Sequence, residues 1–365
     1  MKLVIVESPS KKSTIEKILK KIDPQITYIV AGCLGHIKRI TDEGDTFGID
    51  FENNFQPTYE IVASKDKRKD RRKVIKELKK LAEHAEEVII ATDDDEEGET
   101  IGYQVSEVLG LDIRTNPRII FGKIDEEHLQ EALENVTTVR MPIVHAQQCR
   151  AVSDKLMGFE ISPILQKQME GRHLSAGRVK SVAVMLVLNR QIEQTEFVRE
   201  PYYVTNAIFE PDQRANLDTK FTSDEISKQF LNHCITATFK LSEKNETTRK
   251  VTPPSPFKTS SLLKEAGRKF GMTSKMIMAC AQKLYENGFI SYHRTDSIVL
   301  SEATHTNIRD YVVNTFEENY YKKRNRKNGK NSQEAHEAIH PTDINRLEVS
   351  GKDITSRDCS VYELI

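Results

Sequence analysis

Apolar and polar positions in the first 125 residues follow two periods in turn, which predicts strands alternating with helices. Short apolar runs predict strands at residues 3–6, 88–91 and 118–121. Apolar residues spaced three or four apart predict helices at residues 15–22, 74–85 and 101–109. Such alternation is typical of a mainly parallel sheet with helices on both faces. A more irregular insertion interrupts it from about residue 33 to 63.

The pattern changes three times in the rest of the chain. Residues 125–199 are helical, and the stretch from Arg178 to Glu193 is apolar on most sides, which predicts a buried helix. Residues 201–252 include half-buried strand patterning at 236–241. The run Pro253-Pro254-Ser255-Pro256 predicts a domain boundary. Two helical stripes and a short strand are predicted after it, at 262–270, 277–284 and 289–292.

Length and composition favour a globular protein with two or three domains. The chain has 365 residues, and 38% of them are hydrophobic. Its formal net charge of -1 conceals two strongly basic segments, Lys65 to Lys80 and Lys322 to Lys330. Such segments are either solvated faces or sites that attract a polyanion such as nucleic acid. The overall charge by itself does not favour DNA.

Cysteine usage and hydropathy indicate a soluble, intracellular protein. The five cysteines are widely scattered, without a CxxC pair, so they support neither a disulfide framework nor a zinc ribbon: Cys33, Cys149, Cys234, Cys280 and Cys359. The apolar start of the chain is too short for a signal peptide. No apolar stretch reaches the roughly 20 residues that span a bilayer.

An acidic block after the predicted strand at 88–91 is the first candidate site. Its sequence is Asp93-Asp94-Asp95-Glu96-Glu97-Gly98, and it leads into a predicted helix. Carboxylates crowded at the end of a strand repel one another unless a cation neutralises them, and open α/β sheets bind ligands at that end. The alternation of Asp93, Asp95 and Glu97 suits Mg²⁺, which prefers oxygen ligands. A solvated acidic turn is the alternative, but the flanking elements favour a Mg²⁺ and phosphate site.

The small, basic segment from Gly171 to Arg178 precedes a predicted helix. Backbone N–H groups at a helix N-terminus, with an arginine beside them, favour a phosphate oxygen. A plain helix cap by Ser175 explains the segment equally well.

Tyr292 is the second candidate for a catalytic residue. A tyrosine that ends a strand is usually a core or edge residue. Arg294, however, lies two residues on, so in an extended strand it shares the face of Tyr292. An arginine so placed could clamp a phosphate that the phenolate attacks.

Taken together, these motifs resemble the type IA DNA topoisomerases of the bacterial topoisomerase I kind, and the resemblance runs through nearly all of the chain. The matching segments are VIVESPSK (4–11), LGHI (34–37), ATDDDEEGE (91–99), AQQCR (146–150) continuing to Asp154, LSAGRVKSVAV (174–184), GFISYHRTDS (288–297) and EAHEAI (334–339). Three positions depart from the family pattern. Glu96 stands where arginine is usual, Lys180 where glutamine is common and Ala151 where a second arginine is frequent.

The resemblance implies a multidomain fold that is α/β in one part and mainly helical elsewhere. It comprises a TOPRIM (Rossmann-like) parallel-sheet domain at 1–125, a helical DNA-binding base domain at 126–200, part of a β arch at 201–252 and a helical, winged-helix-like tyrosine domain at 253–365. The chain ends within a helical pattern, so we expect the last domain to be incomplete and the return strands of the arch to be missing. We therefore expect a mobile tyrosine domain, poor cleavage of DNA and no relaxation of plasmid.

The resemblance also implies a reaction. Mg²⁺-dependent, ATP-independent cleavage of one DNA strand through a 5′-phosphotyrosyl link is followed by strand passage and religation, which relaxes negative supercoils. Tyr292 is the implied nucleophile, while Arg294 and Lys11 neutralise the phosphate. Glu7 protonates the leaving oxygen or shares the metal. Asp93 and Asp95 hold Mg²⁺, and Glu97 supports them.

The implied partner is single-stranded or negatively supercoiled DNA, bound by a cytoplasmic, nucleoid-associated monomer without membrane contact. The implied DNA-binding residues are His36, Arg150 paired with Asp154, Ser175, Ala176, Gly177, Arg178, Val179, Lys180 and His336. Two alternatives remain. A TOPRIM primase or nuclease needs the acids without Tyr292 and Arg294, and an inactive fragment only binds single-stranded DNA.

Overall fold

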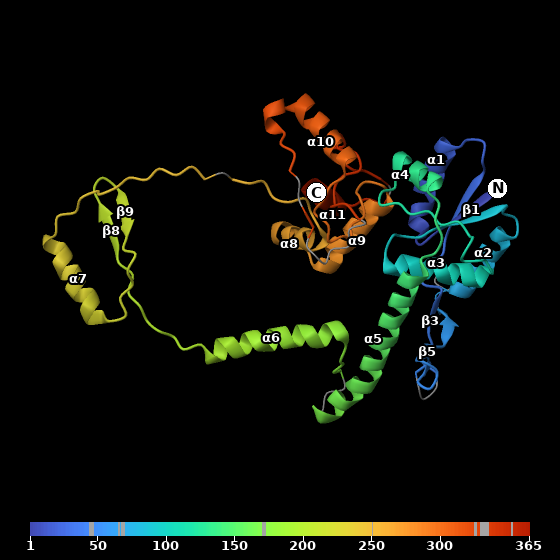
Figure 1. Ribbon diagram of the computed structural model, residues 1–365, viewed down its shortest axis with the longest axis horizontal. Helices are drawn as coiled ribbons and strands as arrows, with labels where there is room; N and C mark the ends of the chain where they lie inside the picture. Colours follow the sequence, from blue (N-terminus) through green and yellow to red (C-terminus); the bar gives the residue numbers. More distant parts are fainter. Residues whose placement is uncertain are drawn as a thin grey trace. The chain divides into compact units, whose positions relative to one another are not determined.

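A computed structural model describes residues 1–43, 47–64, 66, 70–169, 173–249, 251–324, 327–328, 336–351 and 353–365 (Figure 1). The chain forms two compact units. The first joins Met1–Glu160 to Pro254–Ile365, and the second is Ile161–Pro253. No helix in the described ranges is long and apolar enough to cross a membrane.

A three-stranded parallel sheet is the centre of the first unit. Strand β1 (Lys2–Val6) lies between β2 (Tyr28–Gly32) and β7 (Glu87–Ala91). The register sets Val4 opposite Val30 on one side and Ile89 on the other. Parallel pairing places the ends of β1 and β7 at the same edge, so the residues that follow them meet there.

Alternate side chains of the sheet enter two separate apolar cores. Val4 and Val6 pack with α1 (Lys12–Ile22) and α4 (Glu126–Glu134). Leu3 and Ile5 pack with α2 (Arg71–Ala82) and α3 (Glu96–Leu109). Side chains of a strand alternate between its two faces, so an apolar run buried on both faces needs helices on each side. The predicted α/β fold is confirmed.

The part of the chain after Pro254 shares the first of these cores. Leu284, Tyr285 and Ile290 belong to the same buried cluster as Val6 and Ala91. This part contains α8 (Thr259–Phe270), α9 (Ser274–Glu286), α10 (Glu302–Thr315), the short 3-10 helix η2 (Glu318–Tyr320) and α11 (Ser356–Leu364). The expectation that it hangs as a mobile domain is wrong, because a common apolar core holds it on the sheet.

Smaller elements surround the sheet. The insertion contains two antiparallel pairs, β3 (Lys38–Ile40) with β6 (Tyr59–Ile61) and β4 (Ile49–Asp50) with β5 (Gln56–Pro57). The 3-10 helix η1 (Pro9–Lys11) follows β1, and the long helix α5 (Met141–Gln168) follows α4.

Two predicted strands are reduced to single bridges. The segment at 118–121 pairs with β7 only at Arg118, and the segment at 289–292 pairs only through Ile290 with Pro341. Both segments are mostly buried, as their apolar runs require, but among the described residues neither meets a partner strand over more than one residue pair. An apolar run predicts burial better than it predicts a ladder.

The second unit contains α6 (Arg178–Glu196), the antiparallel pair β8 (Asn206–Phe209) and β9 (Gln213–Asn216), and α7 (Asp224–Thr236). The prediction that α6 is buried is wrong for the described residues, since none of its side chains is buried. The apolar composition of α6 suits a helix packed against other elements, whereas the described residues of its own unit do not bury its side chains. The strand predicted at 236–241 is also wrong, because α7 ends there and an irregular segment follows.

The first turn of α3 leaves no space for a side chain at Gly98. A Cβ atom there would lie 2.1 Å from the carbonyl oxygen of Asp93. We expect Gly98→Ala to lower the free energy of unfolding by about 1–3 kcal/mol or more, because the acidic turn must shift. Urea unfolding measures the change. Gly158→Ala is the control, since nothing lies within 4 Å of a Cβ there. Equal stability of the two variants would contradict the close-packing argument.

Candidate active site

The acidic turn between β7 and α3 is built on a helix N-cap. Asp95 is the N-cap residue of α3, and its Oδ1 accepts a hydrogen bond of 2.7 Å from the N–H of Gly98. A carboxylate is favoured at this position because it satisfies an N–H group of the first turn and faces the positive end of the helix dipole. One oxygen of Asp95 is thereby fixed, and the second faces the part of the chain after Pro254.

Tyr292 donates a hydrogen bond of 2.5 Å from its hydroxyl to that second oxygen, Oδ2 of Asp95. Its side chain is almost entirely buried, with 4% exposed. Burial, followed by the charges of Asp95 and Asp93, raises the pKa of the Tyr292 phenol far above its usual range. The resting phenol therefore carries its proton.

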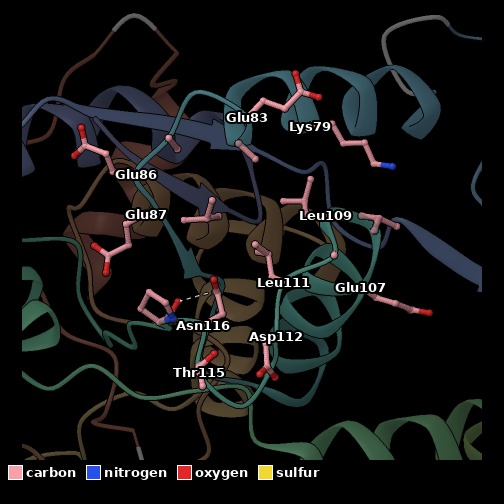
Figure 2. A pocket seen from close by; sticks show the side chains of 16 residues that line it. Lys79, Glu83, Glu86, Glu87, Glu107, Leu109, Leu111, Asp112, Thr115 and Asn116 are labelled. Atoms are coloured by element: carbon pink, nitrogen blue, oxygen red, sulfur yellow. Dashed lines mark hydrogen bonds between the residues drawn. The ribbon is translucent and has the colours of Figure 1, made fainter.

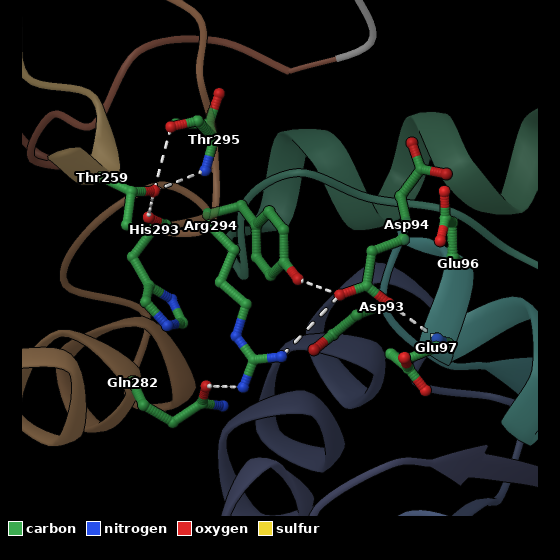
Figure 3. Close-up of polar contacts among 12 residues, drawn as sticks. Asp93, Asp94, Glu96, Glu97, Thr259, Gln282, His293, Arg294 and Thr295 are labelled. Carbon is green, nitrogen blue, oxygen red and sulfur yellow. Dashed lines mark hydrogen bonds and ion pairs between the residues drawn. The ribbon is translucent and has the colours of Figure 1, made fainter. Parts of the chain in front are cut away.

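Arg294, whose side chain is about half exposed, lies near the same carboxylate. Its guanidinium lies 4.0 Å from Oδ2 of Asp95 and donates a hydrogen bond of 3.5 Å to Gln282 (Figure 3). Tyr292 and Arg294 thus converge on one oxygen, so an anion bound beside Tyr292 would meet a cation already in place.

Lys11 holds the first acid of the turn. It is fully buried at the end of η1 and forms an ion pair with Oδ1 of Asp93. The hydroxyl of Tyr285 donates to the same oxygen at 3.4 Å, and the Lys11 ammonium lies 4.9 Å from the Tyr285 ring centre. A buried charge of this kind is tolerated only when it is paired and hydrogen-bonded.

Glu7 lies at the end of β1, beside the acidic turn. Burial, and next the charge of Asp93, raises its pKa to about 7, with a smaller contribution from Asp95. A carboxyl group with this pKa can exchange a proton near neutral pH.

The donor chemistry of Glu7, Asp93 and Asp95 fits a hard divalent cation. After burial, the charge of Asp93 is the next cause of the raised pKa of Glu7, so these carboxylates repel one another, and oxygen ligands are those that Mg²⁺ prefers. No group of three acidic, histidine or cysteine side chains in the described ranges is already arranged to hold an ion. Asp93 is paired with Lys11 and Asp95 with Tyr292, so a cation would have to exchange with these partners.

Glu97, predicted to support the metal pair, is bound to other groups. It accepts a hydrogen bond of 2.6 Å from His36 and forms an ion pair with Arg150 of α5. The bond from His36 is the main cause that lowers the pKa of Glu97. Arg150 also forms an ion pair of 2.8 Å with Glu96, where the family pattern has arginine. The resemblance implied a pairing of Arg150 with Asp154, and in the described part of the chain the ion pairs given for Arg150 are those with Glu96 and Glu97.

His336 lies against the nucleophile candidate. Its Nε2 is 2.8 Å from the carbonyl oxygen of Asp94, and its ring centre is 5.0 Å from that of Tyr292. The first two residues of its motif, Glu334 and Ala335, lie outside the described residues. The structure thus brings His336 to the acidic turn, with little of its surface exposed.

The predicted DNA-binding residues 175–180 lie in the second unit, at the start of α6. The N-cap residue is Gly177, without a side-chain cap, so Ser175 is not the cap. Ser175 instead bonds to Lys180, and the N–H of Ala176 donates to Ser162 at 3.0 Å. Arg178, Val179 and Lys180 are exposed.

Three charged residues that support the turn were not singled out in the sequence. Arg118 and Glu99 are fully buried and 3.3 Å apart, and Arg118 also donates to the carbonyl oxygen of Asp93 at 3.1 Å. Arg140 binds both Glu99 and Asp94. The sequence does show charged residues next to apolar segments at these positions. A hydropathy pattern, however, does not distinguish a buried charged residue from a solvated charged residue.

A second acidic pocket lies at the opposite end of β7 and is lined by Glu83, Glu87, Glu107 and Asp112 (Figure 2). Lys2 pairs with Glu87 at 2.7 Å, and Lys38 pairs with Glu107 at 2.8 Å. Two of these acids are therefore paired with lysines.

His293 is a further residue whose importance the sequence did not reveal. It is 1% exposed, and neither ring nitrogen has a hydrogen-bond partner among the described residues. Burial, and next the charge of Arg294, lowers its pKa to about 3. The folded protein therefore keeps this imidazole neutral across the range in which the unfolded chain takes up a proton.

We expect stability to fall on acidification because of His293. Full stability from this group is present above about pH 6.5 and is lost as the pH falls toward 3, by up to about 1.4 kcal/mol per pH unit. His293→Met should reduce that slope between pH 6.5 and 4.5, measured by urea unfolding. His84→Met, at an exposed position, should leave the slope unchanged. Equal slopes for wild type and His293→Met would contradict the argument.

Comparisons with known proteins cover both parts of the chain. Residues 2–124 match the family model of the Toprim domain, and residues 138–365 match that of DNA topoisomerase. DNA topoisomerase 1 of Campylobacter jejuni is 35% identical over 385 aligned positions, covering 100% of this chain and 53% of the relative. Full-length topoisomerase I from Thermotoga maritima has a similar structure, with a TM-score of 0.81 and 32% identity over 99% of this chain and 59% of that one. The chain spans about half the length of the curated relative.

Proposed function

The chain belongs to the type IA DNA topoisomerase family, and we propose that it carries a DNA-cleavage centre with Tyr292 as the nucleophile. The observation that carries the proposal is the Tyr292 hydroxyl held 2.5 Å from Asp95, with Arg294 on the same oxygen. A Toprim primase or nuclease is disfavoured, because the DNA topoisomerase match covers residues 138–365.

The proposed reaction is an exchange of one ester for another. The Tyr292 oxygen attacks the phosphorus of a phosphodiester in single-stranded DNA, and the bond from phosphorus to the 3′ oxygen breaks. A 5′-phosphotyrosyl link and a 3′-hydroxyl result. Because the new bond conserves the energy of the old one, religation needs no ATP, in keeping with the absence of a GxxxxGK[ST] motif from the sequence.

Two carboxyl groups supply the proton transfers. The Tyr292 proton passes to Asp95 as the new bond forms, since their hydrogen bond is already made. Glu7, with a pKa of about 7, gives a proton to the departing 3′ oxygen. Arg294 stabilises the charge that develops on the phosphate. Lys11 keeps Asp93 in place and adds positive charge near the same point.

Glu7, Asp93 and Asp95 are the residues that would hold Mg²⁺. The bound ion would supply positive charge that keeps the cleaved end in place for religation. Their mutual repulsion supports this assignment. Glu97 has a different proposed role, because its bonds to His36 and Arg150 orient those two basic side chains.

The proposed substrate is single-stranded DNA, such as negative supercoiling exposes. His36 and Arg150 would contact its phosphates beside the acidic turn, and Arg150 would exchange Glu96 for a phosphate oxygen. His336, beside Tyr292, and Asp154 of α5 would orient the strand. In the second unit, exposed Arg178 and Lys180 at the start of α6 suit further phosphates. Strand passage and supercoil relaxation are proposed for the whole protein.

Tyr292→Phe should abolish covalent capture of a single-stranded oligonucleotide and leave its affinity within about twofold, because only the nucleophilic oxygen is lost. Capture is measured as a DNA adduct that resists denaturant, and affinity by fluorescence anisotropy. Tyr320→Phe removes a phenol from an exposed site and should behave as wild type. Adducts formed by the Tyr292→Phe variant would exclude Tyr292 as the nucleophile, and their absence from wild type would count against the cleavage proposal itself.

Asp93→Asn combined with Asp95→Asn should remove the dependence of religation on Mg²⁺, because a ligand set reduced to Glu7 holds this ion poorly. The fraction of adduct religated with Mg²⁺ or with EDTA measures the effect. Mg²⁺ should also raise the melting temperature of wild type and not that of the double variant. Glu83→Gln with Asp112→Asn, in the pocket at the other end of β7, is the charge-matched control. Unchanged Mg²⁺ dependence would overturn the metal assignment.

A further inference from the structure

Three consecutive residues, Gly122 to Ile124, contact the part of the chain that carries Tyr292, and we call this contact segment the seat. They stand at the end of the Toprim match. The N–H of Tyr292 donates a hydrogen bond of 2.9 Å to the carbonyl oxygen of Gly122. The carbonyl oxygen of Ile124 lies so close to Gly288 that a Cβ atom there would be 2.7 Å away. Backbone contacts on both sides therefore bracket Lys123.

Lys123 anchors the middle of this seat through a buried ion pair. Its side chain is nearly buried, and its ammonium lies 3.2 Å from Oε2 of Glu337. It also donates a hydrogen bond of 3.1 Å to the Thr304 hydroxyl.

The partner carboxylate is itself held in place. Its Oε1 accepts a bond of 3.0 Å from the N–H of Ser301, and its Oε2 accepts one of 3.1 Å from Thr304. His340 lies 3.2 Å from Oε2. These bonds hold the Glu337 carboxylate in a position where it pairs with Lys123 of the Toprim part. Glu337 directly follows His336, which contacts Asp94.

Breaking this pair inside the protein is costly, because each charge would be left without a partner in a medium of low dielectric constant. When the two parts separate, water can solvate both charges. The intact pair therefore favours the closed arrangement, and removal of one charge favours the separated one.

We propose that Lys123 is a positioning residue whose ion pair with Glu337 keeps the Tyr292-bearing part closed on the Toprim sheet. The pair touches neither Tyr292 nor Asp95, and it acts through the alignment of the hydroxyl with the acidic turn. The consequence for DNA cleavage rests on the proposed function, whereas the closure itself does not.

The test follows hydrogen exchange at the Tyr292 amide, because its hydrogen bond to Gly122 crosses the seat. Lys123→Met should speed this exchange at least tenfold relative to the amides of β1, which report global unfolding. Lys283→Met is the matched control. It removes a lysine that pairs at 2.7 Å with buried Asp358 and joins α9 to α11 within the Tyr292-bearing part.

Two results would overturn the proposal. One is Tyr292 exchange in Lys123→Met that is as slow as in wild type or rises only in step with β1. The other is an equal selective rise in Lys283→Met. If the pair is the cause, Lys123→Met with Glu337→Gln should exchange no faster than the faster single variant, and additive acceleration would contradict it.

A second measurement separates this proposal from the proposed function. In Lys123→Met, the rate of covalent capture should fall about tenfold while the affinity for single-stranded oligonucleotide stays within about twofold. If wild type forms no adduct, the cleavage proposal fails and hydrogen exchange still decides the role of Lys123. If capture is unimpaired while exchange is faster, closure by Lys123 does not position Tyr292 and that part of the proposal is wrong.

Discussion

Crowding of carboxylates at the end of β7 is the constraint on which the rest of this structure depends. Asp93, Asp94 and Asp95 follow a buried strand, so each needs a partner. Lys11, Arg140 and the N-terminus of α3 supply these partners, and Asp95 keeps one oxygen for Tyr292. Burial, and next the charge of Asp93, raises the pKa of Glu7 beside these acids. A site that combines crowded carboxylates with a carboxyl group of raised pKa is suited to a cation and to proton transfer.

The position of Tyr292 follows from apolar packing more than from its polar contacts. The nucleophile candidate lies about 200 positions after the acids in the sequence, yet both parts of the chain contribute to one core around Val6, Ala91 and Tyr285. The hydrogen bond from the Tyr292 hydroxyl to Asp95 adds a polar contact to this packing. The seat at Gly122 to Ile124 adds backbone hydrogen bonding and an ion pair to the same closure. If the two parts separate, water can solvate both charges of the pair.

Much of the fold could be predicted from the sequence because its signals are local. Hydrophobic periodicity within single segments predicts the strands β1 and β7 and the helices α1 to α3. The proline-rich run predicts the break near Pro254. The predictions failed where a segment's state depends on a partner elsewhere. Among the described residues, 118–121 form a bridge only at Arg118, and no side chain of α6 is buried.

The sequence alone determined which residues are candidates for chemistry, since the acidic block, Tyr292 and Arg294 are recognisable by residue type, spacing and family resemblance. Tertiary structure decided how they are paired: Asp95 with Tyr292, Asp93 with Lys11 and Glu97 with His36. Pairing depends on which side chains meet across elements distant in the sequence, and a local pattern carries no such information. The same holds for His293 and Lys123, whose surroundings come from segments far away in the chain and give each a buried environment that its neighbours in sequence do not reveal.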